Sequence, residues 1–553
     1  MKTVLCFALV LAVLVSLCGC GMKPAEPLPV ALDPQPADED PASAPETAET
    51  GTTDTAEPAE DTPADTPSEP VPLQPDYRLT AALDIPASTK DDGEVVLTET
   101  AVITFTNTSE DVWDRICLRD YAVANLIEED MLSLDGRYST EGSIRGVTDA
   151  AGRTLETAVQ EDRSVVYVTL AEPLQPGART SVTVDFETVV PSGGQRFSWF
   201  TAGDSNTGGN ADTWRTICLS QAYPVLAEYL ADGWNEAPYF TDGECFFSPC
   251  GSYEMTLTLP ADYAVASTGD ETKNPDGTWT LTAENVRDFA VIAGNCYEVL
   301  TAQSCGVTIN SWYIADGTEG TRQQGEVSLQ AAVDAVAAFT EAWGNYPYGE
   351  LDVVAAAYNY GGMEYPGMVR ITDTFAYELQ YEVGEGASGD PKTNLQWDVA
   401  HEVAHEWFYA VVGNDQFREA WLDESFAVYG ELVYQAYTGS TEEELQARVD
   451  GLAREQPMEY IDLSATDYTD PNEQSFLVGY TYAAYKNGPV FLWKLRQAMG
   501  ADTFDAFLKT WYQDHMFREV TTKEFRAAAE EASGGSQAVL DLMAEYLSPD
   551  SEP

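Results

Sequence analysis

The chain has 553 residues, with 28 Lys and Arg against 92 Asp and Glu, and its formal net charge is -64. Nucleic-acid binding depends on clustered basic residues, so this balance excludes DNA and RNA as partners. Because 44% of the residues are hydrophobic and 11% are aromatic, the chain can bury large cores, and its length allows several domains.

Residues 1–19 are typical of a bacterial secretory signal. Lys2 provides the charged start, and the apolar run from Phe7 to Val15 is too short to span a bilayer. The sequence Leu-Cys-Gly-Cys that ends at Cys20 resembles a lipobox, in which the cysteine is lipidated and becomes the first residue. We therefore expect a lipoprotein with a lipid anchor at Cys20, on the outer face of the bacterial membrane. The alternative is an ordinary cleaved signal, which also gives a cell-envelope location.

Residues 20–75 are rich in Pro, Ala, Thr, Asp and Glu. This composition cannot bury enough apolar area to compensate for the entropy lost on ordering, so we interpret the segment as a disordered acidic stalk. From Gly21 to Pro75 it contains 13 acidic residues and one basic residue. Most of the negative charge therefore belongs to the body that follows, and an acidic body would attract cationic peptides by long-range steering.

Residues 76–302 show short runs of alternating apolar and polar residues, rich in Val and Thr and separated by turn residues. This pattern predicts an antiparallel β domain. After Ser328 the apolar residues recur at helical spacing, and helices are expected from there to the carboxyl end. The sequence thus predicts an α+β multidomain chain, with a mostly helical second domain at 303–553.

The predicted body contains six cysteines. An even number outside the cytoplasm is compatible with disulfides, and closely spaced cysteines are the natural pairs. We expect the pairs Cys245–Cys250 and Cys296–Cys305, which leaves Cys117 and Cys218 as the third.

The clearest chemical signal is the H-E-x-x-H motif formed by His401, Glu402 and His405. Residues four apart share one face of a helix, so the two imidazoles can hold one zinc ion while Glu402 reaches a metal-bound water. A chance match is expected only about 0.003 times in a chain of this composition. Pairing of the histidines for purely structural reasons is the weaker interpretation.

A catalytic zinc site needs a third protein ligand and an open position for water. The next helical segment begins at Trp421 and carries Glu424 in its first turn. Two helices joined by a short connection can pack side by side and bring Glu424 opposite the histidines. Asp423 and Glu419 are nearby carboxylates that composition does not exclude.

The spacing of the motif and of the segment WLDES, residues 421–425, resembles the aminopeptidase N family of gluzincin zinc metallopeptidases. This resemblance selects Glu424 as the third zinc ligand. Residues 361–365, GGMEY, are similar to the family's G-x-M-E-N motif, although Tyr365 replaces the usual Asn. The resemblance implies that Glu364 binds the α-amino group of a peptide and that the backbone of Gly361 and Gly362 lines the substrate.

Two further residues follow from the same resemblance. Tyr485 matches the family tyrosine that stabilises the oxyanion, with Tyr480 and Tyr482 as competitors. Gln221 is the candidate from the β domain for a second contact to the substrate amine. The family also implies a saddle-like amino-terminal β domain, a thermolysin-like catalytic domain, and a short form without the carboxyl-terminal helical domain of longer members.

The sequence therefore predicts a zinc-dependent aminopeptidase with one zinc ion, which removes amino-terminal residues from peptides. Glu402 would act as general base and then as general acid, and the metal would activate a water. Two alternatives remain open. One is a noncatalytic envelope lipoprotein that binds peptides, and the other is a zinc hydrolase with endopeptidase activity.

Overall fold

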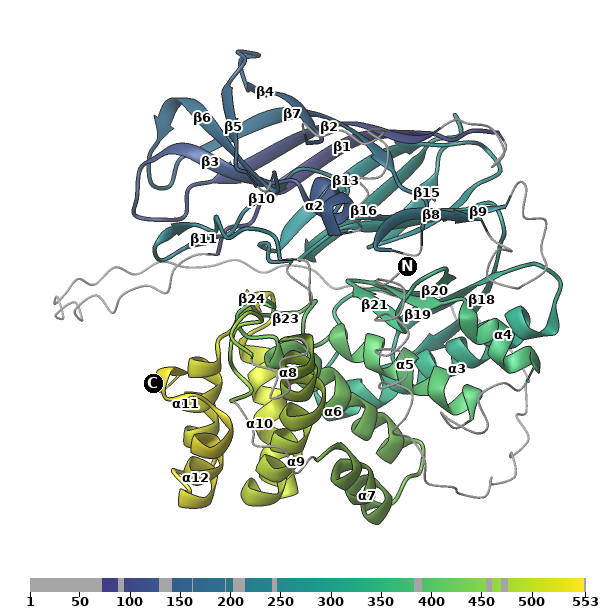
Figure 1. Cartoon of the computed structure of the whole chain (residues 1–553), viewed down its shortest axis with the longest axis vertical. Helices are drawn as coiled ribbons and strands as arrows, with labels where there is room; N and C mark the ends of the chain where they lie inside the picture. The colour runs from purple at the N-terminus through teal and green to yellow at the C-terminus, as the bar shows by residue number, and fades with distance from the viewer. Residues whose placement is uncertain are drawn as a thin grey trace, which may run out of the picture.

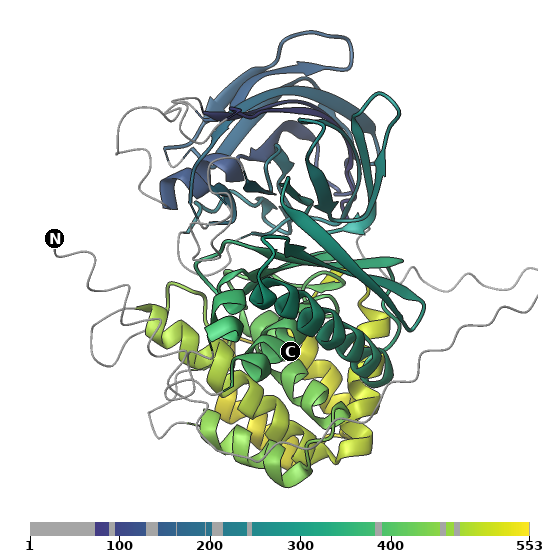
Figure 2. The same ribbon diagram turned by 90° about the vertical axis from the view of Figure 1, so that its right-hand side faces the viewer.

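The computed structural model describes residues 72–87, 94–128, 142–161, 163–193, 195–201, 214–240, 246–381, 390–453, 460–468 and 476–551. Cys20 and most of the predicted stalk lie outside these residues. Two bodies are stacked along the long axis, a β-rich body and a body rich in helices (Figure 1, Figure 2). The expected order of a β domain followed by a mostly helical domain is confirmed.

The amino-terminal domain is built from sheets that enclose one apolar core. Its largest sheet has seven strands in the order β15 (Asp270–Lys273), β16 (Trp279–Val286), β13 (Gly251–Thr258), β1 (Asp76–Asp84), β2 (Val95–Thr106), β7 (Arg179–Val190) and β4 (Ile144–Asp149). Burial alternates along β2, as expected for a strand with one face toward the core. All neighbours in this sheet are antiparallel except β1 and β13, which pair in parallel.

Smaller sheets complete this domain. One contains β10 (Val225–Leu226), β3 (Trp113–Arg119), β6 (Val165–Leu174) and β5 (Glu156–Val159), and another contains β14 (Ala264–Ser267), β17 (Ala290–Gly294), β9 (Arg215–Ser220) and β8 (Phe197–Thr201). The pair β11 (Tyr229–Leu230) and β12 (Gly233–Trp234) and the short helix α2 (Tyr121–Glu128) lie beside them.

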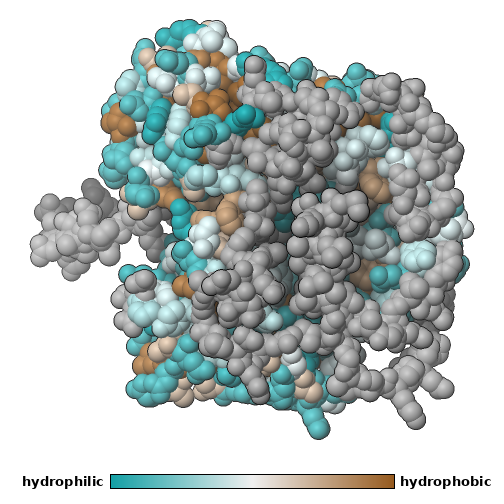
Figure 3. Space-filling view, viewed as in Figure 1, coloured by the Kyte–Doolittle hydropathy of each residue, from teal (hydrophilic) through white to brown (hydrophobic). Residues whose placement is uncertain are grey.

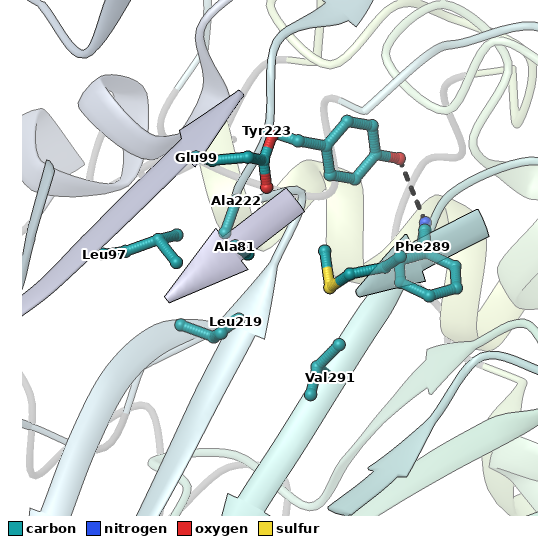
Figure 4. Close-up of a pocket in the computed structure, with 9 residues that line it drawn as sticks. Ala81, Leu97, Glu99, Leu219, Ala222, Tyr223, Phe289 and Val291 are labelled. Carbon is teal, nitrogen blue, oxygen red and sulfur yellow. Dashed lines mark hydrogen bonds between the residues drawn. The ribbon is translucent and has the colours of Figure 1, made fainter. Parts of the chain in front are cut away.

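Glu99 is a carboxyl group inside this apolar core. It points from β2 into a small cavity lined by aliphatic and aromatic side chains (Figure 4). Burial raises its pKa well above the usual value for Glu, because no positive charge compensates for the lost hydration. Burial therefore favours the uncharged form of Glu99, and its buried carboxyl group is not part of the negative surface.

The second domain combines a five-stranded sheet with a layer of helices. The strand order is β18 (Tyr297–Ser304), β19 (Val307–Ile314), β20 (Glu350–Ala356), β22 (Met368–Thr372) and β21 (Gly362–Tyr365), so β21 is an edge strand. This sheet begins at Tyr297, slightly before the boundary expected near residue 302. One of its faces packs on the helices, and the other faces the amino-terminal domain.

The helices follow the sheet in chain order. They are α3 (Glu319–Ala342), α4 (Thr374–Tyr381), α5 (Pro391–His405), α6 (Trp421–Tyr437), α7 (Glu442–Leu452), α8 (Phe476–Tyr482), a π-helical turn η2 (Ala483–Asn487), α9 (Gly488–Met499), α10 (Ala501–Asp514), α11 (Thr522–Ala532), α12 (Gln537–Tyr546) and a final 3-10 turn η3 (Pro549–Ser551). The strands β23 (Val412–Gly413) and β24 (Arg518–Glu519) pair near the domain interface. Helix α3 begins nine residues before the position expected from its periodicity.

A capping residue and a row of buried apolar side chains explain where helix α5 starts and how it packs. The Asp390 side chain accepts a hydrogen bond from the backbone of Thr393, and Pro391 occupies the first turn, where its missing N–H costs nothing. Leu395, Val399 and Val403 are fully buried against the helical core. This packing holds the opposite face of α5 next to α6, and that face carries the histidines.

Arg287 joins the two domains. Its guanidinium is almost fully buried, donates to the backbone oxygen of Tyr409 at 3.0 Å and forms an ion pair with Glu519 at 2.5 Å. A side chain at Gly413 would lie 2.0 Å from the guanidinium carbon, so glycine is required there. The ion pair and the close approach fix the loop after β16 against the turn that follows α5.

Two of the expected disulfides, Cys296–Cys305 and Cys117–Cys218, are wrong, because Cys218, Cys296 and Cys305 form no disulfide among the described residues. Cys245 lies outside those residues, so the pair Cys245–Cys250 stays a prediction. Cys296 and Cys305 stand at opposite ends of β18, whose eight residues span about 26 Å, far beyond the reach of a disulfide. Short separation in sequence predicted proximity, but an extended strand separates the pair.

Polar side chains cover most of the described surface in the view of Figure 3. Among the residues that the structure describes, no helix is both long enough and apolar enough to cross a membrane.

Candidate active site

Helices α5 and α6 bring His401, His405 and Glu424 to one point. The two Nε2 atoms are 3.2 Å apart, and Oε2 of Glu424 lies 3.3 Å from Nε2 of His401 and 3.6 Å from Nε2 of His405. Ligand atoms about 2.0–2.1 Å from one zinc ion in tetrahedral geometry stand about 3.3 Å apart. The three predicted ligands therefore have the spacing of a zinc site.

The pKa shifts of these side chains also fit a metal site. Burial alone lowers the pKa of His401, but the carboxylates of Glu424 and Glu431 outweigh burial and raise it to about 10. The pKa of Glu424, which burial alone would raise, is lowered by the two imidazolium groups. The carboxylates therefore favour positive charge at this point, which is what a metal ion provides once its ligands have lost their protons.

His405 is oriented by Asp423. Its Nδ1 forms a hydrogen bond with Oδ1 of Asp423, and Oδ2 of Asp423 accepts a hydrogen bond from Gln416 at 2.6 Å. All three side chains are buried. Asp423, which the sequence left open as a ligand, contacts the other nitrogen of His405, so it holds the ring with Nε2 toward Glu424.

His401 has a partner that sequence reasoning missed. Its Nδ1 lies 3.1 Å from Oε1 of Glu431, whose second oxygen forms an ion pair with Arg448. Glu431 stands seven residues after Glu424, which places both on one face of α6. Its spacing of seven residues from Glu424 is the sequence signal that could have identified Glu431.

Glu402 and β21 are in close contact. A side chain at Gly362 would lie 2.4 Å from Oε1 of Glu402, so only glycine allows the strand to approach the helix here. The backbone of Gly361 is exposed and that of Gly362 is half-buried, next to this carboxylate. The predicted general base thus lies beside the predicted substrate-lining glycines.

Glu364 points toward the metal ligands. One of its oxygens lies within 4.8 Å of a ring nitrogen of His405 and of an oxygen of Asp423. The hairpin that carries it is fixed by Glu406, which accepts hydrogen bonds from the backbone of Gly367 at 3.0 Å and from Tyr346 at 2.8 Å. Glu406 therefore holds the turn after Glu364 against the end of α5.

Tyr365, the departure from the G-x-M-E-N pattern, faces away from the site. Successive residues of a strand point to opposite faces, so Met363 and Tyr365 lie opposite Glu364. Both pack with Cys218 and Ile292 of the amino-terminal domain. The Tyr365 ring is 1% exposed. It therefore fills the domain interface, and the face of β21 toward α5 retains Gly362 and Glu364.

Tyr485 reaches the third ligand from a turn of π-helix. Its hydroxyl donates a hydrogen bond to Oε1 of Glu424, and its ring stacks on that of His401 with centroids 6.3 Å apart. Single π-helical turns occur frequently at functional sites. Tyr480 is buried in the core, where its ring contacts the ring of Tyr485, so the hydroxyl at the metal ligands is that of Tyr485.

Gln221 lies in a buried network of the amino-terminal domain. Its Nε2 donates to Oδ2 of Asp288 at 2.7 Å, and the same oxygen accepts from the hydroxyl of Tyr409 at 2.5 Å. Burial and the carboxylate of Asp288 raise the pKa of Tyr409, and the charge of Glu364 contributes to the same shift. Asp288 was not predicted, and a contact between Gln221 and a substrate amine stays a prediction.

Comparison with known proteins gives a consistent result. Residues 328–546 match the peptidase family M1 domain. Aminopeptidase M1-A from Oryza sativa subsp. japonica is 27% identical over 240 residues, which cover 40% of this chain and 26% of that protein. Human aminopeptidase B is 26% identical over 194 residues, covering 33% of this chain and 27% of that protein. The chain thus matches about a quarter of the length of these relatives.

A solved structure with a similar fold is an M1 zinc metallopeptidase from Deinococcus radiodurans. It shares 18% identity and a TM-score of 0.56, and the match covers 87% of this chain and 96% of that chain. The match to the family M1 domain and the three predicted zinc ligands together identify the second domain as a zinc metallopeptidase domain. More narrowly, the chain carries a peptidase family M1 domain, and the resemblance drawn from its motifs is confirmed. Zinc is the cofactor of this class.

Removing the partner of His405 tests the assignment of the zinc site. Asp423→Asn keeps the size of the side chain but removes the charge that orients the imidazole, and we expect zinc affinity to fall about tenfold to hundredfold. Zinc affinity is measured by competition with a chromogenic chelator. Asp514→Asn, an exposed change on α10, is the control. Unchanged zinc affinity in Asp423→Asn would contradict the role of Asp423.

Proposed function

We propose that the chain is a zinc-dependent aminopeptidase, which hydrolyses the first peptide bond of peptides with a free amino terminus. The observation that carries this proposal is the position of Glu364, a buried carboxylate within 4.8 Å of His405. A fixed carboxylate beside the metal binds a cationic amine and sets the distance from the amino terminus to the reacting bond. A structural neighbour, a variant M1 zinc metallopeptidase from Deinococcus radiodurans, was solved with a Tyr-Ser-Ala substrate.

The residues of the chain have distinct roles in this reaction. His401, His405 and Glu424 would hold zinc, which polarises a carbonyl and lowers the pKa of water when bound. Glu402 would take the proton of the attacking water and pass it to the leaving amine. The Tyr485 hydroxyl, beside Glu424, would donate to the developing oxyanion, a contact typically worth about 3 kcal/mol.

The edge strand β21 provides the binding surface for the peptide backbone. Its inner side pairs with β22, and it ends the sheet. An extended peptide can therefore pair with its outer side by β-augmentation, with Gly361 and Gly362 leaving room for close approach. This arrangement favours a peptide over a compact substrate.

A noncatalytic peptide-binding protein would need fewer of these features. It has no use for a carboxylate at the position of Glu402 together with three convergent metal ligands. Endopeptidase activity is the second alternative, and the charge of Glu364 argues against it because an internal peptide bond offers no amine to this carboxylate.

Glu402→Gln separates catalysis from metal binding. The amide keeps the size of the side chain but cannot accept the proton of water, so we expect kcat to fall on the order of a thousandfold. Zinc content, measured by atomic absorption, should stay at one ion per chain. Turnover near that of the unmodified protein would contradict the mechanism, and hydrolysis that resists a chelator would contradict the metal.

Glu364→Ala tests the recognition of the amine. We expect kcat/KM for free peptides to fall roughly a hundredfold, because a charge-assisted contact to the substrate is lost. Cleavage of the same peptides after acetylation should be slow in both proteins. Equal cleavage of free and acetylated peptides by the unmodified protein would favour the endopeptidase alternative and contradict the role of Glu364.

We also propose that the protein is displayed on the cell surface as a lipoprotein, anchored through Cys20 in the lipobox-like sequence. Cys20→Ser should remove lipidation and move the protein from the membrane fraction to the soluble fraction, as measured by fractionation after labelling with a fatty acid. Incorporation of the label into the serine variant would contradict the anchor at Cys20.

A further inference from the structure

The contacts of residues 361–364 with α5 follow the same order along both segments. The backbone of Gly361 lies beside Asp398, since a side chain there would be 2.9 Å from its Oδ2. Gly362 lies beside Glu402 in the same way, and Glu364 lies near His405. Strand and helix therefore advance in the same direction, and Asp398 and Glu364 stand on opposite sides of Glu402.

This order fixes the direction of a bound peptide. If the amine lies at Glu364 and the scissile bond lies at Glu402, the chain continues toward Gly361. Asp398 is four residues before Glu402, which is about one turn or 6 Å along the helix. A residue of an extended peptide spans about 3.3 Å. The side chain that follows the scissile bond therefore comes within reach of Asp398.

Asp398 is a partly exposed carboxylate without a compensating partner. Within the part of the chain that the structure describes, it forms no hydrogen bond or ion pair. The charged groups that act on it most strongly are Glu431 from α6, His401 of its own helix, Glu378 from α4 and Arg448 from α7. Arg448 and His401 lower the pKa of Asp398, but the ion pairs that they form are with Glu431.

The environment of Asp398 favours a positive charge. Burial and the carboxylate of Glu431 raise the pKa of Asp398 to about 7. Burial also raises the pKa of Glu378, which has no ion-pair partner among the described residues. An ammonium or guanidinium group entering this place would stabilise both carboxylates in their charged forms.

We propose that Asp398 is a specificity-determining residue that selects a lysine or arginine immediately after the scissile bond. The proposal rests on the proposed aminopeptidase function and names its preferred substrates: peptides whose second residue is basic. A glutamate or aspartate at that position would be repelled by Asp398 and Glu378, and a neutral residue would be intermediate.

The test uses the full-length zinc enzyme and three free tripeptides that differ only at the second residue, which is lysine, norleucine or glutamate. Norleucine matches the length of lysine without its charge. We expect kcat/KM to decrease in the order lysine, norleucine, glutamate. In Asp398→Asn the ratio of lysine to glutamate should fall at least about tenfold, whereas Asp514→Asn should leave this ratio unchanged.

Binding gives a second readout that does not depend on turnover. Dissociation constants of the three peptides are measured by calorimetry with Glu402→Gln and with the double variant Glu402→Gln, Asp398→Asn. The preference for lysine should be present in the first and lost in the second. Zinc content and melting temperature confirm that both variants are folded.

The outcomes are distinct. Equal kcat/KM for the three peptides, or an equal loss for all three in Asp398→Asn, overturns the proposal while the aminopeptidase function stands. Absence of cleavage of every free peptide by the unmodified protein overturns the proposed function, and the proposal falls with it.

Discussion

The structure depends on the contact between α5 and α6, where two imidazoles and three carboxylates are buried together. Taking these groups out of water is costly unless their charges compensate one another. The surrounding residues provide that compensation: Arg448 pairs with Glu431, and Gln416 donates to Asp423. Each histidine is thereby fixed through Nδ1, so that both Nε2 atoms face Glu424. Separating the two helices would leave buried charges unpaired. The predicted metal site therefore also holds α5 and α6 together.

The proposed position of the peptide depends on a second set of constraints around β21. Glu406, in the turn that ends α5, holds the hairpin through the backbone of Gly367, and Gly362 allows the strand to touch Glu402. The opposite face of the strand is buried against the amino-terminal domain through Tyr365. The amino-terminal domain therefore packs against the face of β21 that is turned away from the site. Arg287 holds the two domains together through Tyr409 and Glu519.

Local spacing predicted the part of the site that lies on one helix, which is His401, Glu402 and His405. The choice of Glu424 among three nearby carboxylates came from the family resemblance, as did Glu364 and Tyr485. Asp288 could not be found in this way, because a strand and a loop far apart in sequence bring it to Gln221 and Tyr409. The expected disulfide Cys296–Cys305 is wrong for the complementary reason: residues that are near in sequence are not near in space when an extended strand separates them. Local sequence patterns also could not predict the parallel pairing of β1 with β13.

The net charge of -64 and the carboxylate of Asp398 would act on the proposed peptide substrate at different ranges. Surface acids are screened within about 8 Å at physiological salt, so they affect the encounter with a cationic peptide and little else. Asp398 is partly buried and lies beside Gly361, where the peptide backbone is proposed to bind, so salt screens it far less. Steering by the whole body raises the rate of association of any basic peptide, wherever its positive charge lies. Only a charge held one helical turn from Glu402 can distinguish a lysine at the second position from a lysine further along the same peptide.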